Sequence, residues 1–274
     1  MRRPAEKPKA KKEAEQVEHI EERSTPPTPV IYEIVRRYGE DEMARPAASL
    51  WWSGLAAGLS ISFSLLAEAI LRMHLPDAQW RPLVVALGYP VGFLMAVLGR
   101  QQLFTENTIT VVLPIIARPT ASNFRRGGRM WGIVLAANLA GTLAAALFIT
   151  FTPVIDDALR EAMLAISREA LAHSWLELAL RGITAGFLMA AIVWLHPSSE
   201  SAQFYVIVAM TWLIAVSGSA HIVAGSVGAF LLFASGELGA GPLGGFLLPV
   251  LAGNVVGGTV LFAMIAYAQV MKEI

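Results

Sequence analysis

Apolar residues fill six long segments of the chain, and short polar stretches separate them. The segments run roughly over residues 49–72, 82–117, 130–152, 175–195, 202–234 and 243–271. A helix rises about 1.5 Å per residue, so about 20 apolar residues are needed to cross the hydrocarbon layer of a bilayer. Each segment meets that length, and the pattern therefore predicts six transmembrane helices.

Polar residues interrupt the second and the fifth of these segments. Residues 100–108 split the second segment, and residues 217–221, which end on His221, split the fifth. Lipid cannot form hydrogen bonds with freed backbone groups, so irregular backbone at membrane depth occurs only inside the protein or along a cavity. We therefore predict that both helices are broken and that the breaks mark a transport pathway.

The two halves of the chain share a short motif. Asn138-Leu139-Ala140-Gly141 in the third segment matches Asn254-Val255-Val256-Gly257 in the sixth, at an offset of 116, and the same offset takes Thr105 to His221. Halves of three crossings have opposite orientations in a membrane, so the match indicates an inverted repeat of residues 49–152 and 175–271. A coincidental match is the alternative, because small residues are common in membrane helices. The predicted fold is an all-α integral membrane protein with two inverted three-helix repeats and an aquaporin-like protomer.

The N-terminal region differs from the rest of the chain. Residues 1–28 are rich in charge and lack the order of a cleavable signal peptide, which predicts a disordered tail. Ile31, Ile34, Val35 and Tyr38 then recur at helical spacing, which predicts an amphipathic helix over 29–40. This helix lies either on the membrane surface or on the protein itself. We divide the chain into a cytoplasmic tail over 1–45 and a six-span domain over 46–274.

Composition supports this assignment, and charge adds an orientation. The chain is 55% hydrophobic and 15% charged, which suits a protein solvated mainly by membrane lipid. A net charge of zero disfavours a nucleic-acid partner, and the absence of cysteine excludes thiolate metal sites; no metal or cofactor is expected. Four arginines crowd the loop after the second segment: Arg118, Arg125, Arg126 and Arg129. By the positive-inside rule, both termini are cytoplasmic.

Four stretches resemble the formate/nitrite transporter family, in particular its YfdC-like branch of inner-membrane proteins. They are Gly99-Arg100-Gln101-Gln102-Leu103-Phe104-Thr105-Glu106-Asn107-Thr108, Thr211-Trp212-Leu213-Ile214-Ala215, His221-Ile222-Val223-Ala224-Gly225-Ser226-Val227, and Leu248-Pro249 to Gly258. The resemblance covers about residues 45–271. It implies a six-helix protomer with one central pore, assembled as a homopentamer in the cell inner membrane. It also implies passage of small monovalent anions of the formate, nitrite and hydrosulfide class, or of their conjugate acids.

The resemblance also implies roles for particular residues. Family members narrow the pore with apolar side chains at the broken second helix, which Leu103, Phe104 and Thr105 match, and place a histidine on the fifth, which His221 matches. Our hypothesis is that donors near Thr105 and His221 stabilise an entering anion, which gains a proton close to the histidine. The other pathway candidates and the repeat positions are Asn107, Gly218 and Ser219, with Asn138 and Asn254.

Several positions depart from the family pattern. Ala220 and Gly225 stand where formate transporters often carry Glu and Asn, and Gly186 stands where they tend to carry a further Asn. No vestibule lysine is evident around Ala170.

Four charged residues lie inside predicted spans: Glu68, Arg100, Glu106 and Arg181. Each is suited either to attract or select an anion or to form a structural pair, and we favour structural pairing. Glu68 with Arg72, and Glu177 with Arg181, have the four-residue spacing of helical ion pairs. Arg100 and Glu106 flank the first break and are placed to stabilise it.

Other functions stay open on the sequence. An intramembrane enzyme would need more than His221 with Glu106, and no protease, kinase or metal motif supports one, so we predict no enzyme. A channel for water or a small neutral solute fits six spans, but paired Asn-Pro-Ala boxes are absent and the central histidine is unexplained. A non-transporting membrane component of a stress response is the remaining alternative, because of the departures from the family pattern.

Overall fold

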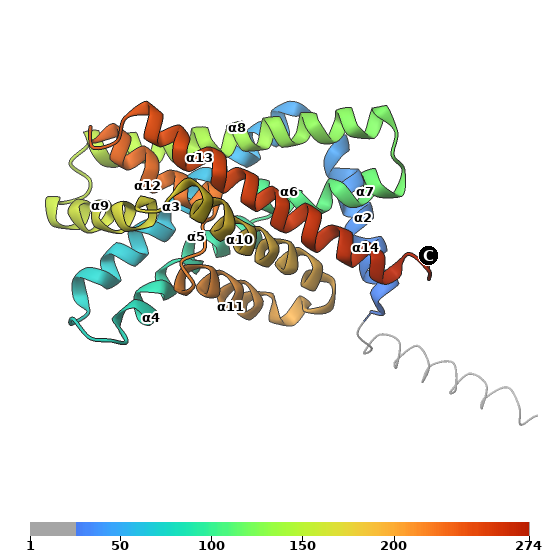
Figure 1. Ribbon diagram of the computed structural model, residues 1–274, viewed down its shortest axis with the longest axis horizontal. Helices are drawn as coiled ribbons and strands as arrows, with labels where there is room; N and C mark the ends of the chain where they lie inside the picture. The colour runs from blue at the N-terminus through green and yellow to red at the C-terminus, as the bar shows by residue number, and fades with distance from the viewer. Residues whose placement is uncertain (1–25, 274) are drawn as a thin grey trace, which may run out of the picture.

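The structure is a computed structural model that describes residues 26–273. The predicted disordered tail lies outside the described residues up to residue 25. Every regular element between residues 26 and 273 is a helix, and most of the helices run along the long axis of the molecule (Figure 1). This agrees with the predicted all-α class.

The six predicted crossings correspond to these helices. The unbroken ones are α3 (Ala47–His74), α8 (Ala121–Phe151), α10 (Trp175–Leu195), and the run of α13 (Ala240–Val255), η4 (Val256–Ala263) and α14 (Met264–Val270). The second crossing consists of α4 (Arg81–Val85), η1 (Ala86–Gly88) and α5 (Pro90–Leu98), followed after a break by α6 (Phe104–Thr110) and α7 (Val112–Ala117). The fifth consists of α11 (Gln203–Val216) and α12 (Ile222–Ala234). Five helical runs of the described chain are long and apolar enough to cross a membrane, and the two halves of the fifth crossing are shorter.

The same helix pairing occurs in both halves. α3 packs along α8 in the first half, and α10 packs along α13 and η4 in the second. Glycines allow this close approach: a Cβ atom on Gly58 would lie 2.3 Å from the carbonyl oxygen of Asn138, and one on Gly186 would lie 2.2 Å from that of Asn254. The asparagine motif that suggested a repeat is thus the contact point of equivalent helix pairs.

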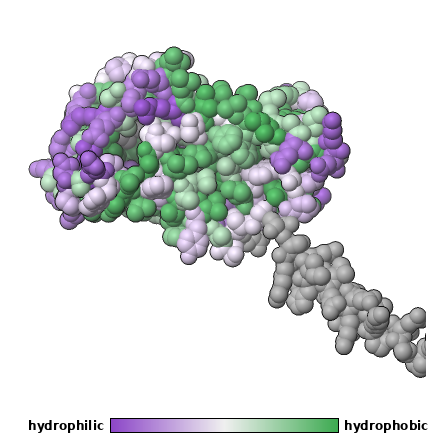
Figure 2. Space-filling view, turned by 60° about the horizontal axis from the view of Figure 1, so that its bottom comes forward, coloured by the Kyte–Doolittle hydropathy of each residue, from purple (hydrophilic) through white to green (hydrophobic). Residues whose placement is uncertain are grey.

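The outer surface suits lipid contact. Hydrophobic residues cover the middle of the molecule, and hydrophilic ones gather at its two ends (Figure 2). Large apolar side chains stay exposed on the long helices, among them Phe63, Phe148, Leu213 and Ile265. An exposed apolar belt between polar ends is what a bilayer requires of a spanning protein.

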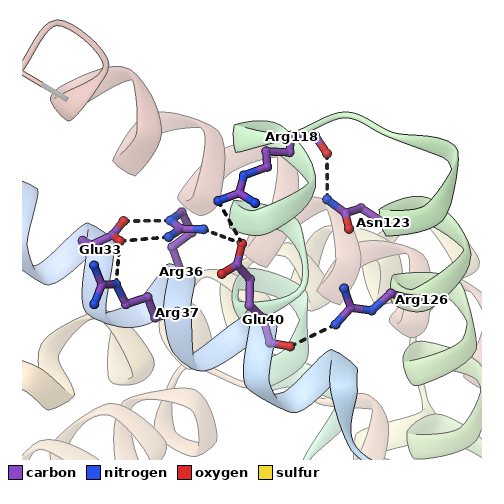
Figure 3. A network of polar contacts seen from close by, with 7 residues as sticks. All are labelled: Glu33, Arg36, Arg37, Glu40, Arg118, Asn123 and Arg126. Carbon is purple, nitrogen blue, oxygen red and sulfur yellow. Dashed lines mark hydrogen bonds and ion pairs between the residues drawn. The ribbon is translucent and has the colours of Figure 1, made fainter.

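Two shorter helices cover the ends of the bundle. α9 (Asp157–Leu171) packs against α3 and α12. At the other end, α2 (Thr28–Ala44) buries Ile31, Tyr32 and Val35 against α6, α7 and α14. Glu40 of α2 lies 3.9 Å from the guanidinium of Arg118, and its carbonyl accepts a 3.3 Å hydrogen bond from Arg126 (Figure 3). α2 therefore rests on the protein's own bundle.

The last crossing is continuous but contains a π-helical stretch, which the sequence pattern did not predict. It spans Val256–Ala263 and faces α6. A Cβ on Gly258 would lie 2.0 Å from Thr108 Oγ1, and the Thr259 hydroxyl donates a 3.0 Å hydrogen bond to the Thr108 carbonyl. π-turns occur frequently at functional sites. Here the turn brings the sixth crossing against the helix that follows the first break.

Candidate functional site at the two helix breaks

The two breaks meet at the centre of the protein. Thr105, in the first turn of α6, lies with its Oγ1 2.7 Å from Nε2 of His221, which immediately precedes α12. Thr105 is 0% exposed and His221 is 1% exposed. Two polar side chains from segments 116 residues apart therefore form a buried contact in the middle of an apolar bundle.

The half-helices before the two breaks end in the same way. Arg100 follows α5 with φ of 50°, and Gly218 follows α11 with φ of 63°. In each break the next amide, that of Gln101 or Ser219, donates to the carbonyl five residues earlier, at 2.9 and 3.0 Å. This is a Schellman ending, in which a residue in the left-handed conformation terminates the helix.

Two buried asparagines hold the breaks in place. Asn138 Oδ1 accepts a 2.9 Å hydrogen bond from the first amide of α6, and Asn254 Oδ1 accepts a 2.8 Å hydrogen bond from the first amide of α12. Each Nδ2 donates to two carbonyls, one within the break and one on the neighbouring long helix. Both asparagines are 0% exposed. Each amide side chain thus satisfies two backbone groups that the interruption of a helix leaves without partners, and adds one hydrogen bond to a carbonyl of a continuous helix.

This geometry corrects the predicted register of the repeat. Leu103 precedes α6 with φ −106° and ψ 122°, and His221 precedes α12 with φ −106° and ψ 127°. The equivalent positions are therefore 103 and 221, which are 118 apart, while the asparagines are 116 apart. The second half is two residues shorter between its break and its asparagine. Thr105 is consequently the contact partner of His221, whereas the residue equivalent to His221 in the first repeat is Leu103.

The hydrogen bonds of His221 define its tautomer. Nδ1 accepts a 3.1 Å hydrogen bond from the Ala224 amide, at the start of α12. A neutral imidazole with Nδ1 as acceptor carries its proton on Nε2, so Nε2–H donates to Thr105 Oγ1. The hydroxyl proton of Thr105 is then available to another acceptor. Phe93 of α5 packs edge-on against the imidazole, with ring centroids 5.0 Å apart. The sequence shows Phe93 only as one apolar residue among others, so this contact could not be predicted from it.

A cavity approaches this pair from each end of the protein. The α9-side cavity has a volume of about 300 Å³, and its lining includes His221, Tyr89, Arg181 and Phe246. The α2-side cavity has a volume of about 240 Å³ and is lined by residues that include Tyr38, Arg100, Glu106, Asn107 and His196. The first cavity ends at His221, and the second ends at the residues that directly follow Thr105. The buried pair therefore separates two hollows.

The other pathway candidates fall into two groups. Gly218 and Ser219 line the α9-side cavity, and Asn107 lines the α2-side cavity. Leu103 and Phe104 are buried and line neither. The Phe104 ring packs edge-on against Trp131 of α8, at 5.7 Å between centroids. A role for these two side chains in narrowing the pore stays a prediction.

The charged residues are not paired as their spacing suggested. Arg72 lies 2.5 Å from a carboxylate oxygen of Glu169 on α9, and Arg181 donates a 2.7 Å hydrogen bond to the Gly218 carbonyl. The four-residue spacing predicts ion pairs only within one helix, so it could not predict these contacts between different elements. Arg100 and Glu106 form no ion pair with each other in the described chain. Arg181, which sequence reasoning treated as structural, is placed on the fifth-helix break and on a cavity wall.

The departures from the family pattern have local explanations. A Cβ on Gly225 would lie 2.6 Å from the Phe246 ring, so an aromatic side chain fills the space beside this glycine. Gly186 faces the backbone of α13, where a longer side chain does not fit. Ala170 lines the α9-side cavity together with Arg181, so that cavity does contain a cation.

Comparison with known proteins agrees with this architecture. The family model described as formate/nitrite transporter matches residues 29–268. Inner membrane protein YfdC of Escherichia coli (strain K12) is 39% identical over 264 residues, which covers 96% of this chain and 85% of that protein. Formate channel FocA of Haemophilus influenzae is 27% identical over 187 residues, covering 66% of this chain and 64% of that protein.

Solved structures show the same fold. An FNT family ion channel superposes with a TM-score of 0.72 at 20% identity, covering 88% of this chain and 98% of that chain. A pentameric formate channel with formate bound superposes with a TM-score of 0.68 at 20% identity, covering 82% and 98%. With the family model matched over most of its length and an extended 39% identical relative, this chain belongs to the formate/nitrite transporter family.

Proposed function

We propose that the protein transports a small monovalent anion, or its conjugate acid, past the contact between Thr105 and His221. The observation that most directly supports this function is the buried 2.7 Å contact at the meeting point of two helix breaks, with a cavity on each side. The formate, nitrite and hydrosulfide class is the proposed substrate class. The formate channel among the relatives supports it.

Electrostatics favours an anion on the approach to the pair. α6 and α12 both begin at the breaks, and the beginning of a helix carries partial positive charge. Arg181 adds a full positive charge on the wall of the α9-side cavity. An anion is therefore attracted toward the centre before it loses its hydration.

Neutralisation then lowers the barrier. An isolated carboxylate in an apolar medium of low dielectric is unfavourable by tens of kcal/mol, whereas a protonated small acid is only a modestly polar solute. In our mechanism a hydronium ion in the α9-side cavity gives His221 a second proton on Nδ1 and leaves as water. The protonated Nδ1 can no longer accept the hydrogen bond from the Ala224 amide. The imidazolium attracts an anion in this cavity, which both His221 and Ala224 line, and the Nδ1–H bond breaks as its proton passes to the anion. The neutral acid leaves, and the neutral ring restores the bond to the amide.

We infer an assembly and an orientation for the same function. The superposed solved channel is pentameric, and the related YfdC is an inner membrane protein, which supports a homopentamer in the inner membrane. Arg118 and Arg126 lie at the end of the bundle that carries α2. By the positive-inside rule that end is cytoplasmic, together with both termini.

The test is flux through the purified protein in liposomes. Formate, nitrite, hydrosulfide, acetate and water are followed by stopped-flow methods over a range of pH, with protein-free liposomes subtracted. We expect at least one of the anions to move in the native protein and none in His221→Phe. His74→Phe is the matched control, because His74 is exposed and lines none of the cavities described above. Movement of water alone, or no movement at all, overturns the proposal in favour of a neutral-solute channel or a non-transporting role.

A further inference from the structure

Arg100 occupies a backbone conformation that favours glycine. Its φ of 50° is the only positive value at a non-glycine residue between residues 26 and 273. The equivalent position in the second break is Gly218, the usual residue for a left-handed helix ending. The backbone turn therefore does not need an arginine, and strain of this kind is retained where a side chain has a function. The side chain, which lines the α2-side cavity, is the feature to explain.

The α2-side cavity contains polar groups that lack protein partners. Arg100 makes no ion pair and no side-chain hydrogen bond with any described residue. Glu106 Oε1 and His196 Nε2 are buried atoms for which residues 26–273 supply no hydrogen-bond partner. These two buried atoms are unfavourable in an apolar bundle unless something completes them. Arg100 is exposed, and its side chain adds a positive charge to the lining of the same cavity. A cation, a carboxyl group and an imidazole around one hollow are therefore suited to a small polar ligand.

The neighbouring side chains on α2 do not supply the missing hydrogen-bond partners of this cavity. Tyr38 of α2 lines the same hollow and can contribute a hydroxyl group. Glu42, also on α2, is already held by Gln102 at 2.5 Å and by Arg45 at 2.9 Å. Glu106 is therefore the carboxyl group left for the ligand.

We propose that the α2-side cavity is a second anion site, in which Arg100 binds the small anion and Glu106 exchanges a proton with it. This inference rests on the proposed transport function. In the step, the O–H bond of the Glu106 carboxylic acid breaks and a new O–H bond forms on the bound formate or nitrite. The neutral acid moves on toward Thr105, and the Glu106 carboxylate regains its proton from cytoplasmic water.

Charge balance is the physical reason for this pairing. Before the step, the negative charge beside Arg100 is on the anion. After the step, it is on the Glu106 carboxylate. The guanidinium therefore faces one negative charge throughout, and no uncompensated charge is created in the low-dielectric bundle. The bidentate guanidinium also suits the two oxygens of formate or nitrite.

The binding half is tested by calorimetry in detergent with sodium formate and sodium nitrite. Arg100→Gly removes the side chain and installs the residue that the backbone prefers, so its thermal unfolding temperature should not fall. We expect its dissociation constant to rise at least tenfold, which corresponds to about 1.4 kcal/mol. Arg100→Lys should lie between Arg100→Gly and the native protein. Arg125→Ala, an exposed change outside the cavity, should match the native protein. Native affinity in a folded Arg100→Gly protein overturns the assignment.

The proton half is tested in liposomes that contain a pH-sensitive dye. Glu106→Gln keeps the size and a hydrogen-bond donor but cannot exchange a proton. We expect it to bind formate with an affinity within about threefold of native, while formate-driven acidification falls at least tenfold. Native acidification in Glu106→Gln overturns the proposed proton exchange. His221→Phe separates this inference from the transport proposal: it should abolish flux while anion binding that depends on Arg100 persists. Loss of that binding in His221→Phe argues against a separate site.

Discussion

Replacement of Asn254 by alanine gives the sharpest test of how the breaks are held. The side chain accepts a 2.8 Å hydrogen bond from the first amide of α12 and donates to the carbonyls of Gly182 and Ala220 at 2.9 and 2.8 Å. Alanine leaves two backbone groups of the break without their partner, the Ile222 amide and the Ala220 carbonyl, whereas the Gly182 carbonyl lies within the continuous helix α10. Each such group costs about 1 to 3 kcal/mol, and partial relaxation reduces the sum, so we expect a loss of about 2 to 4 kcal/mol.

Two measurements report this loss of stability. Thermal unfolding in detergent reports the change in stability, and hydrogen exchange of the peptide that contains Ile222 reports local opening of the second break. Asn138→Ala should cause a comparable loss, with the faster exchange at Phe104, because its hydrogen bonds are equivalent. Asn123→Ala is the control: this half-buried asparagine lies away from the breaks and its side chain donates one hydrogen bond to the Arg118 carbonyl, so the change in stability should be less than about 1 kcal/mol.

The reasoning is refuted if Asn254→Ala unfolds at the temperature of the Asn123→Ala control. It is also refuted if exchange rises evenly over the whole protein and not at the break. Either result would mean that packing of the long helices, and not these hydrogen bonds, holds the interrupted backbone.

Three further predictions concern packing and pH. Gly186→Ala should sharply lower the yield of folded protein, because its Cβ would lie 2.2 Å from the α13 backbone. Gly128→Ala is the control: its Cβ would have no atom within 4 Å, so thermal unfolding should show it to be neutral or stabilising by about 1 kcal/mol. Gly225→Asn should destabilise the protein by collision with Phe246, and the added change Phe246→Ala should restore folded yield; equal yields for both variants would contradict the steric account. Hydrogen bonds from two neighbouring arginines lower the pKa of Glu33 on α2 to about 2, from 4.5. Both arginines lie on α2, so the contribution of Glu33 to the stability of this helix is complete above pH 4.5 and is lost as the pH falls toward 2. Faster hydrogen exchange in α2 should report this loss, and Glu33→Gln should remove the pH dependence.

Much of the fold could be predicted because the bilayer restricts the choices. Apolar runs longer than one crossing allow little but a helix, and a polar insert at membrane depth must be a break inside the protein. The stretches around residues 100–108 and 217–221 showed this signal clearly. The meeting of Thr105 and His221 also followed, since an inverted repeat brings its two breaks together.

The errors arose where the information lies between distant residues. The asparagine motif gave the repeat but not the number of residues between motif and break, so Thr105 was equated with His221 in place of Leu103. Same-helix spacing suggested partners for Arg181 that its contact with the Gly218 carbonyl replaces. The π-helical turn depends on how Thr108 approaches the sixth crossing, which no local pattern encodes.

At the two breaks, the residues that shape the backbone differ from the residue that directly precedes each half-helix. The same bend forms with leucine at position 103, which has no capping side chain, and with histidine at position 221. The bend therefore depends on the distant asparagines and tolerates different chemistry at the residue that faces its centre. In the proposals above, the histidine that precedes the second half-helix handles a proton, whereas its equivalent at the first break is an apolar leucine and the carboxyl group, Glu106, lies three residues further on. The residue that precedes each half-helix is therefore open to substitution for a different chemistry while the backbone of the break is kept.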